Sequence, residues 1–265
     1  MKNTQIISVI NQKGGVGKTT TVINLATSLS FNKKILVIDL DPQGNATTGF
    51  GLSNTDNNKT IYDVLNGNSD FEDAIRDTKI DNLKLVSSNV DLSGLEVETA
   101  SENRRAFLLK DKIENFINSS RNDFSYIFID CPPSLSLLTV MSLVVAKSLI
   151  VPLQAEFFAL EGLSQLVKTI DRVKIKLNPE LEIRGVLLTM FDKRNKLSSQ
   201  VDLEARKFFK EKVYQTQIPR NVRLSEAPSH GIPVVIYDKS CAGSRAYSSF
   251  AEEFLKQENV METAA

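Results

Sequence analysis

Histidine and cysteine are scarce in this sequence of 265 residues, which has one histidine, His230, and two cysteines, Cys131 and Cys241. The single histidine argues against a metal site built from histidines and against a Ser-His-Asp triad. Two cysteines far apart in the chain do not form a disulfide framework, so we expect a reducing compartment. We expect Cys131 to be a small buried residue rather than a reactive thiol.

The distribution of apolar residues also predicts neither a membrane span nor a secretory signal. The longest apolar region, 137–153, is interrupted by Lys147 and Pro152, which divide it into a helix and a strand. Residues 1–5 are polar and lead directly into an apolar run, so no secretory signal is predicted. We therefore expect a cytoplasmic protein without a membrane partner.

Net charge is absent as well, because 32 basic and 32 acidic side chains cancel. The charge is nevertheless uneven: residues 168–223 contain 14 lysines and arginines and 7 acids, an excess that the rest of the chain balances. Such a segment indicates either a surface that faces a polyanion or an ordinary solvated surface. The apolar and charged fractions, 42% and 24%, are those of a soluble globular protein.

The stretch 6–20 carries the strongest local signal. An apolar, β-branched run at 6–10 predicts a strand buried on both faces. The run is followed by Lys13-Gly14-Gly15-Val16-Gly17-Lys18-Thr19-Thr20 and then by an apolar helical pattern. A glycine loop in this position can bend around an anion, and the start of the helix adds its dipole. Lys18 would bring its charge to the β- and γ-phosphates, and Thr19 its hydroxyl to Mg²⁺. The alternative is a glycine-rich turn that only begins a helix.

The loop departs from the standard GxxxxGK[ST] motif, because Gln12 or Lys13 occupies the position of the first glycine. With its additional lysine, the segment 13–20 resembles the deviant Walker A motif of the ParA/MinD ATPases. The resemblance implies that residues 13–20 bind ATP and that Lys13 and Lys18 take part in catalysis. It also implies that Lys13 reaches across an ATP-dependent homodimer to the partner's nucleotide.

Two acids follow the next predicted strand, 34–38, in the segment Asp39-Leu40-Asp41-Pro42-Gln43-Gly44-Asn45. Open α/β sheets bind ligands at the carboxyl ends of their strands, although Asp, Pro, Gly and Asn also favour a plain turn. The segment resembles the DxDPQxN switch region of the ParA family. By that resemblance Asp41 orients or activates the attacking water, and Asp39 supports the Mg²⁺ shell.

A third acid ends the apolar strand predicted at 125–130. An apolar strand that ends in aspartate is the Walker B pattern, in which the carboxylate holds Mg²⁺, often through water. Such a strand end is common, but its place after the glycine loop and before Pro132-Pro133 strengthens the interpretation. The family resemblance assigns this role to Asp130, with Thr19 and Asp39 as the other residues of the metal site.

A segment near the end of the chain, 218–228, reads Ile-Pro-Arg-Asn-Val-Arg-Leu-Ser-Glu-Ala-Pro. It resembles the corresponding segment of the chromosomal, Soj-type ParA proteins, and the resemblance places Pro219 and Asn221 beside the adenine of ATP. It also matches Arg194 and Arg223 to arginines that bind DNA without sequence preference. The alternative is that both arginines are plain surface charges.

The periodicity predicts alternating strands and helices. The expected strands are 6–10, 34–38, 83–86, 125–130, 149–153, 183–190 and 213–218. The expected longer helices are 18–29, 103–116, 137–146, 160–177, 198–210 and 244–257. This alternation predicts an α/β fold with a doubly wound, mostly parallel sheet and helices on both faces. We expect the P-loop NTPase fold in a single domain over residues 1–265.

The resemblance covers nearly the whole chain and is most specific at 11–20, 39–47, 128–133 and 218–231. It implies an ATP-dependent chromosome-partitioning ATPase whose homodimer binds double-stranded DNA without sequence preference, in association with the nucleoid. It further implies slow hydrolysis that a ParB-like protein stimulates. Because only twelve residues precede Lys13, we do not expect an N-terminal extension that reads a specific operator.

Three alternatives differ from this interpretation in defined features. A MinD-like membrane ATPase needs a basic amphipathic C-terminal helix, whereas the last helix here carries Glu252 and Glu253. A reductase like the nitrogenase iron protein needs paired cysteines in cluster-binding contexts, which the two distant cysteines do not supply. A non-catalytic, nucleotide-dependent scaffold needs no carboxylate that orients water, and Asp41 argues against it.

Overall fold

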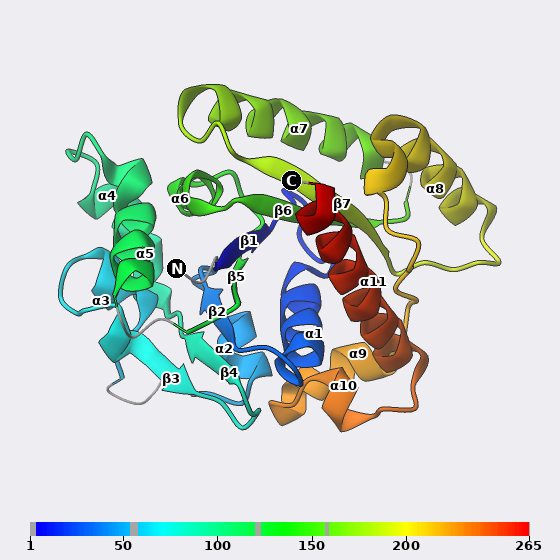
Figure 1. Ribbon diagram of the computed structural model, residues 1–265, viewed down its shortest axis with the longest axis horizontal. Coiled ribbons are helices and arrows are strands. Elements are labelled where there is room, and N and C mark those ends of the chain that lie inside the picture. Colours follow the sequence, from blue (N-terminus) through cyan, green and yellow to red (C-terminus); the bar gives the residue numbers. More distant parts are fainter. Residues whose placement is uncertain (1–3, 54–57, 120–122, 157–158, 265) are drawn as a thin grey trace.

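The computed structural model describes residues 4–53, 58–119, 123–156 and 159–264. These residues form a seven-stranded sheet in the order β3-β4-β2-β5-β1-β6-β7 (Figure 1). The strands are β1 (Gln5–Val9), β2 (Ile35–Asp39), β3 (Ile75–Asp77), β4 (Leu83–Val86), β5 (Tyr126–Asp130), β6 (Ser148–Gln154) and β7 (Glu182–Thr189). Neighbouring strands are parallel except β3, which is antiparallel to β4 at one edge. The predicted doubly wound, mostly parallel sheet is confirmed.

Helices cover both faces of this sheet (Figure 1). They are α1 (Lys18–Ser30), α2 (Asn45–Gly49), α3 (Ile61–Leu65), α4 (Leu95–Glu98), α5 (Leu108–Asn118), α6 (Leu137–Val145), α7 (Ala159–Lys176), α8 (Lys196–Phe209), α9 (Val222–Glu226), α10 (Val234–Tyr237) and α11 (Ala242–Ala264). Successive strand residues face opposite cores, because side chains alternate along a strand. Ile6 packs in the core beneath α5, α6 and α7, whereas Ile7 packs in the core beneath α1 and α11.

The strand order reverses around β1, and this reversal positions the site. From β1 the chain crosses through α1 to β2, beyond β5, whereas β6 pairs with β1 on its other side. Ligands of open α/β sheets bind outside the carboxyl ends of the strands at such a point. In the parallel register Val9 and Asp39 both lie opposite Asp130, so the three strand ends meet at one place.

The prediction of a strand at 213–218 is wrong. Val213 and Pro219 make only isolated bridges to β7 and its continuation. Side chains satisfy much of the segment's backbone instead. Arg206 of α8 donates to the carbonyls of Val213 (3.2 Å) and Tyr214 (3.0 Å), and Glu253 of α11 accepts from two further N–H groups, at 2.6 and 2.9 Å.

One other expectation from periodicity needs adjustment. The helix predicted at 103–116 begins later, as α5, after a 3-10 turn at Arg105–Phe107. Cys131 is buried as expected, and burial raises the pKa of its thiol to about 12.

Within the part of the chain that the structure describes, no helix combines the length and the apolar character that a membrane crossing needs.

Candidate functional site

Two glycines and two tethers hold the loop between β1 and α1 in shape. Gly15 and Gly17 have φ of +73° and +91°, a left-handed conformation that residues with a Cβ rarely adopt. The Asn11 side chain donates to a β6 carbonyl (2.7 Å), and Thr189 at the end of β7 donates to the carbonyl of Val16 (2.8 Å). The loop and the first turn of α1 therefore form the kind of backbone cradle that binds anions.

Lys18 lies inside this loop and Lys13 at its rim. Lys18 is 6% exposed, and its Nζ donates to the carbonyl of Lys13 (3.2 Å) across the loop. Burial lowers the pKa of Lys18, while the nearby carboxylates of Asp130 and Asp41 oppose that shift. The Lys13 side chain is 48% exposed and forms an ion pair with Glu156. The two lysines that the sequence groups together are thus oriented differently.

Thr19 and Asp130 form a compact pair of oxygen ligands beside the loop. The Thr19 hydroxyl donates to Asp130 Oδ2 (2.7 Å), whereas the buried Asp130 Oδ1 accepts no hydrogen bond from the described residues. Burial, with the neighbouring Asp39, raises the pKa of Asp130 well above its usual range. An unpartnered buried carboxylate oxygen next to a hydroxyl fits Mg²⁺, which takes few protein oxygens and keeps water and phosphate ligands.

Asp39 and Asp41 have different surroundings, although Asp39 ends β2 and Asp41 comes only two residues later. Asp39 is fully buried; its Oδ1 accepts from the Asp41 N–H (3.2 Å), and its Oδ2 accepts from the N–H and the hydroxyl of Thr47 (both 2.8 Å). Burial raises the pKa of Asp39 to about 6, against the effect of the Thr47 hydrogen bonds. Asp41 accepts from the Gln43 N–H (3.0 Å) and lines an open cavity, which Asp39 does not.

The cavity beside the loop brings four predicted segments together. Its volume is about 530 Å³, within the range of about 300–1,000 Å³ that small-molecule sites occupy. Its walls come from the glycine loop, from the segment after β2, from Pro133 after β5 and from the turn before Gly231. The lining residues include Gly14, Gly15, Gly17, Lys18, Thr19, Thr20, Asp41, Gln43, Asn45, Thr48, Pro228 and Ser229. We call this hollow the phosphate cavity.

A second, smaller hollow of about 330 Å³ adjoins the first. We call it the base cavity; both hollows are lined by Gly17, Thr20 and Met190. Pro219 and Asn221 line the base cavity, as does Tyr247 of α11. Asn221 is fixed as the N-cap of α9, because its Oδ1 accepts from the Arg223 N–H (3.0 Å). The structure therefore places Pro219, Asn221 and most of the residues predicted for the phosphates around adjoining hollows, whereas Lys13 and Val16 line neither of them.

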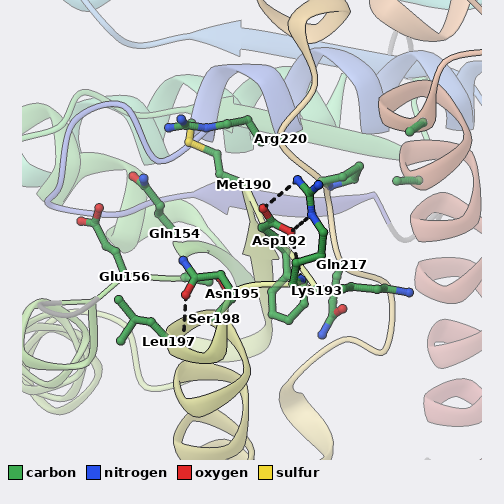
Figure 2. A pocket seen from close by; sticks show the side chains of 16 residues that line it. Gln154, Glu156, Met190, Asp192, Lys193, Asn195, Leu197, Ser198, Gln217 and Arg220 are labelled. Carbon is green, nitrogen blue, oxygen red and sulfur yellow. Dashed lines mark hydrogen bonds and ion pairs between the residues drawn. The ribbon is translucent and has the colours of Figure 1, made fainter.

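A third cavity, of about 810 Å³, is more polar (Figure 2). Figure 2 shows Gln154, Glu156, Asp192, Asn195 and Arg220 around it, from the ends of β6 and β7, the start of α8 and the segment before α9. This cavity adjoins the base cavity, since Arg220 lines both.

The two arginines predicted to contact DNA are both exposed and both paired with acids. Arg194, whose side chain is 92% exposed, binds both carboxylate oxygens of Asp192, at 3.2 and 3.3 Å. Arg223 binds Glu226 at 2.7 Å and Asp238 at 3.5 Å. Hydrogen bonding to these acids raises the pKa of each arginine. Neither guanidinium is a free cation in this state of the protein.

Sequence reasoning missed three residues of the site. Thr189 is the last residue of β7 and Met190 the first after it; Met190 has φ of +50° and lines all three cavities. Their place at the carboxyl end of a parallel strand was a usable signal. Tyr247 comes from α11, and its hydroxyl is 3.2 Å from that of Thr21. No local pattern in the sequence places a residue of the last helix at the base cavity.

Comparison with known proteins agrees with this geometry. Residues 4–183 match the family model described as an AAA domain. The chain is 50% identical over 255 residues to the chromosome partitioning protein ParA of Caulobacter vibrioides, covering 96% of this chain and 95% of that protein. It is 44% identical over 250 residues to the chromosome-partitioning ATPase Soj of Treponema pallidum, covering 94% and 96%.

A solved structure shares the fold at lower identity. Cobyrinic acid a,c-diamide synthase from Mycobacterium smegmatis, with a bound ATP analogue and magnesium, superimposes with a TM-score of 0.83. It is 33% identical, and the match covers 96% of this chain and 94% of that one. The glycine loop, the acids at the strand ends and the identity over nearly the whole length lead to one conclusion: this chain belongs to the ParA/Soj family of chromosome-partitioning ATPases.

Proposed function

We propose that this protein is an ATP-dependent chromosome-partitioning protein that acts as a single ATPase domain over residues 1–265. One observation carries the proposal. The phosphate cavity is lined at once by residues of the anion-binding loop and by Asp41, a carboxylate from the segment after β2. A site that only bound nucleotide would need the loop but not the carboxylate.

ATP occupies the two adjoining cavities in this proposal. Loop 13–20 holds the phosphates, while Pro219 and Asn221 hold the base. Thr19 and Asp130 would hold Mg²⁺, and Asp39 would support the shell of the ion. When bound, Mg²⁺ supplies positive charge that neutralises the phosphate oxygens. Asp41 accepts a hydrogen bond from the attacking water and orients it toward the γ-phosphate, and Lys18 stabilises the charge of the phosphates.

Association of two copies accompanies ATP binding in this proposal. Lys13 supports this step, because it is half-exposed at the rim of the loop and pairs with Glu156 rather than with the loop's interior. To reach a partner's nucleotide, Lys13 must leave Glu156. Lys13→Ala should then lose dimerisation more than it loses nucleotide binding, which light scattering with ATP and with ADP can measure.

DNA is the polyanion that we propose for the basic segment 168–223. Arg194 and Arg223 contact phosphates without reading bases, so the protein associates with the nucleoid in the cytoplasm. Each arginine exchanges an acid of its own chain for a DNA phosphate. Dimerisation joins two weak patches into one footprint, so tight binding needs ATP. A ParB-like protein stimulates the slow hydrolysis and ends this state.

A mobility assay on unrelated DNA duplexes, at several salt concentrations and with ATP, ADP or no nucleotide, tests this proposal. Binding should need ATP, ignore sequence and weaken steeply with salt. Each arginine on a phosphate should account for about one unit of the log–log salt slope, so Arg194→Ala with Arg223→Ala should nearly abolish binding by the dimer.

The matched control is Arg104→Ala, because Arg104 is an exposed arginine paired with Asp111 outside the basic segment. This variant should bind DNA like the wild type. Unimpaired binding by the double variant, or a strong preference for one DNA sequence, would contradict the proposed DNA contacts and leave the ATPase assignment standing.

A further inference from the structure

Thr47 is a buried polar residue of α2 to which neither the sequence motifs nor the cavities assign a role. It is 0% exposed and does not line the phosphate cavity. Its hydroxyl both donates and accepts: it donates to Asp39 Oδ2 (2.8 Å) and accepts from the Ser88 N–H (3.2 Å). The hydroxyl thus joins the segment after β2 to the chain that follows β4.

The acceptor role of the hydroxyl fixes the direction of its proton. Ser88 is fully buried, and a buried N–H group left without an acceptor is costly. The Thr47 oxygen accepts that N–H, so its single proton is directed to Asp39. The Thr47 N–H adds a second bond to the same carboxylate oxygen, at 2.8 Å. Two donors from one residue therefore hold the Asp39 carboxylate in one orientation.

The orientation of the Asp39 carboxylate in turn fixes the backbone of Asp41. Its other oxygen, Oδ1, accepts the Asp41 N–H (3.2 Å), which places the backbone of the residue that lines the phosphate cavity. The bonds from the Gln43 N–H to Asp41 Oδ1 and from the Gly44 N–H to the Asp41 carbonyl lie within the segment and define its shape. The bonds through Thr47 instead attach that shape to the ends of β2 and β4.

We propose that Thr47 is a positioning residue for ATP hydrolysis: it locks the Asp39 carboxylate, which in turn holds Asp41 at the phosphate cavity. This inference rests on the proposed role of Asp41. Water positioning matters in the reaction and not in ATP binding, so a misplaced Asp41 slows turnover and leaves affinity intact. A residue that only stabilised α2 would not separate the two quantities.

Three single variants test the inference. Thr47→Val keeps the shape of the side chain and removes the hydroxyl, and Thr47→Ser keeps the hydroxyl. Thr27→Val is the matched control, because Thr27 is also 0% exposed and its hydroxyl donates to a carbonyl of its own helix, that of Ile23 (2.7 Å). Thermal melts establish that each variant is folded before its kcat and its Kd for ATP are measured.

Thr47→Val should lower kcat by about tenfold or more, the effect of losing a hydrogen bond to a charged group, and should change the Kd for ATP by less than about threefold. Thr47→Ser should recover most of the rate, and Thr27→Val should keep it. Because Thr47 acts through Asp41, Asp41→Ala combined with Thr47→Val should be no slower than Asp41→Ala alone.

Wild-type turnover in Thr47→Val beside an inactive Asp41→Ala would overturn this inference and leave the proposed function intact. A parallel loss of kcat and affinity, an equal loss in Thr27→Val, or a further slowing in the double variant would overturn it as well. Normal turnover in Asp41→Ala would instead remove Asp41 from the mechanism, and the inference about Thr47 with it.

Discussion

Lys18 is the residue whose surroundings most constrain its role. Its ammonium is buried against the loop carbonyl of Lys13 and faces the carboxylates of Asp41 and Asp130. Lys18→Ala removes this cation from the proposed phosphate site, so ATP affinity should fall by about 100-fold or more, the loss of a charge-assisted contact made by a buried lysine. Calorimetric titration with ATP measures this.

A suitable control is Lys33→Ala, because Lys33 is exposed and lines neither the phosphate nor the base cavity. That variant should bind ATP like the wild type. Unchanged affinity in Lys18→Ala would remove the lysine from the phosphate site.

At this scale the sequence predicted what is local. Gly15, Gly17, Lys18 and Thr19 lie within one loop and the helix that follows, so their spacing alone groups them around an anion. Asp130 could be placed because a parallel strand delivers its last residue to the same edge. Tyr247 could not, because only the packing of α11 against α1 brings it to the base cavity.

At the scale of elements, α2 and the turn at Ala227–His230 approach each other through two glycines. Gly51 and Gly231 have φ of +74° and +62°, and a Cβ on Gly231 would lie 2.5 Å from Gly51 Cα. Since backbone and not a flexible side chain is in the way, Gly231→Ala adds a clash to the strain of a left-handed alanine. We expect a loss of about 2–4 kcal/mol in the free energy of unfolding.

The control for this prediction is Gly67→Ala. Gly67 has φ of +82°, but a Cβ there would meet nothing within 4 Å, so strain acts without a clash. This variant should lose about 1–2 kcal/mol. Urea unfolding of both variants measures the difference. Equal losses would show that the approach of Gly51 and Gly231 is not tight in solution.

The segment 213–218 shows why some elements escape prediction. Its apolar and β-branched residues have the composition of a strand, and isolated bridges to β7 do form. Four other backbone groups are bound by Arg206 from α8 and Glu253 from α11, two side chains distant in sequence. These tertiary hydrogen bonds take the place of the bonds that a further parallel strand would make. The seventh strand of the sheet is instead the antiparallel edge strand β3.

At the scale of the whole molecule, buried acids make the stability of the nucleotide-free, metal-free protein depend on pH. The pKa of Asp39 is raised to about 6, and that of Asp130 is raised as well. The folded state favours the protonated carboxyl of Asp39. The contribution of this group to the free energy of unfolding is therefore fully present below about pH 4, its pKa in the unfolded chain, and is lost as pH rises through its folded pKa near 6.

Asp39→Asn removes the ionisable carboxyl of Asp39, and with it the free-energy cost of ionising that buried group as pH rises. Relative to the variant, the wild type should lose about 2 kcal/mol of unfolding free energy between pH 4.5 and pH 7.5. Urea unfolding in a chelating buffer, with the difference between the two proteins taken at each pH, provides the test. A difference independent of pH would contradict the shifted pKa of Asp39.

We propose a division of labour inside the phosphate cavity: the glycine loop binds ATP, and Asp41 from the segment after β2 promotes its hydrolysis. Asp41→Ala separates the two most directly, when calorimetric ATP binding and phosphate release are measured on one preparation. We expect a Kd within about threefold of the wild type and a turnover lower by about 100-fold or more, the contribution of a positioned carboxylate. Normal turnover, or a loss of binding as large as the loss of turnover, would contradict it.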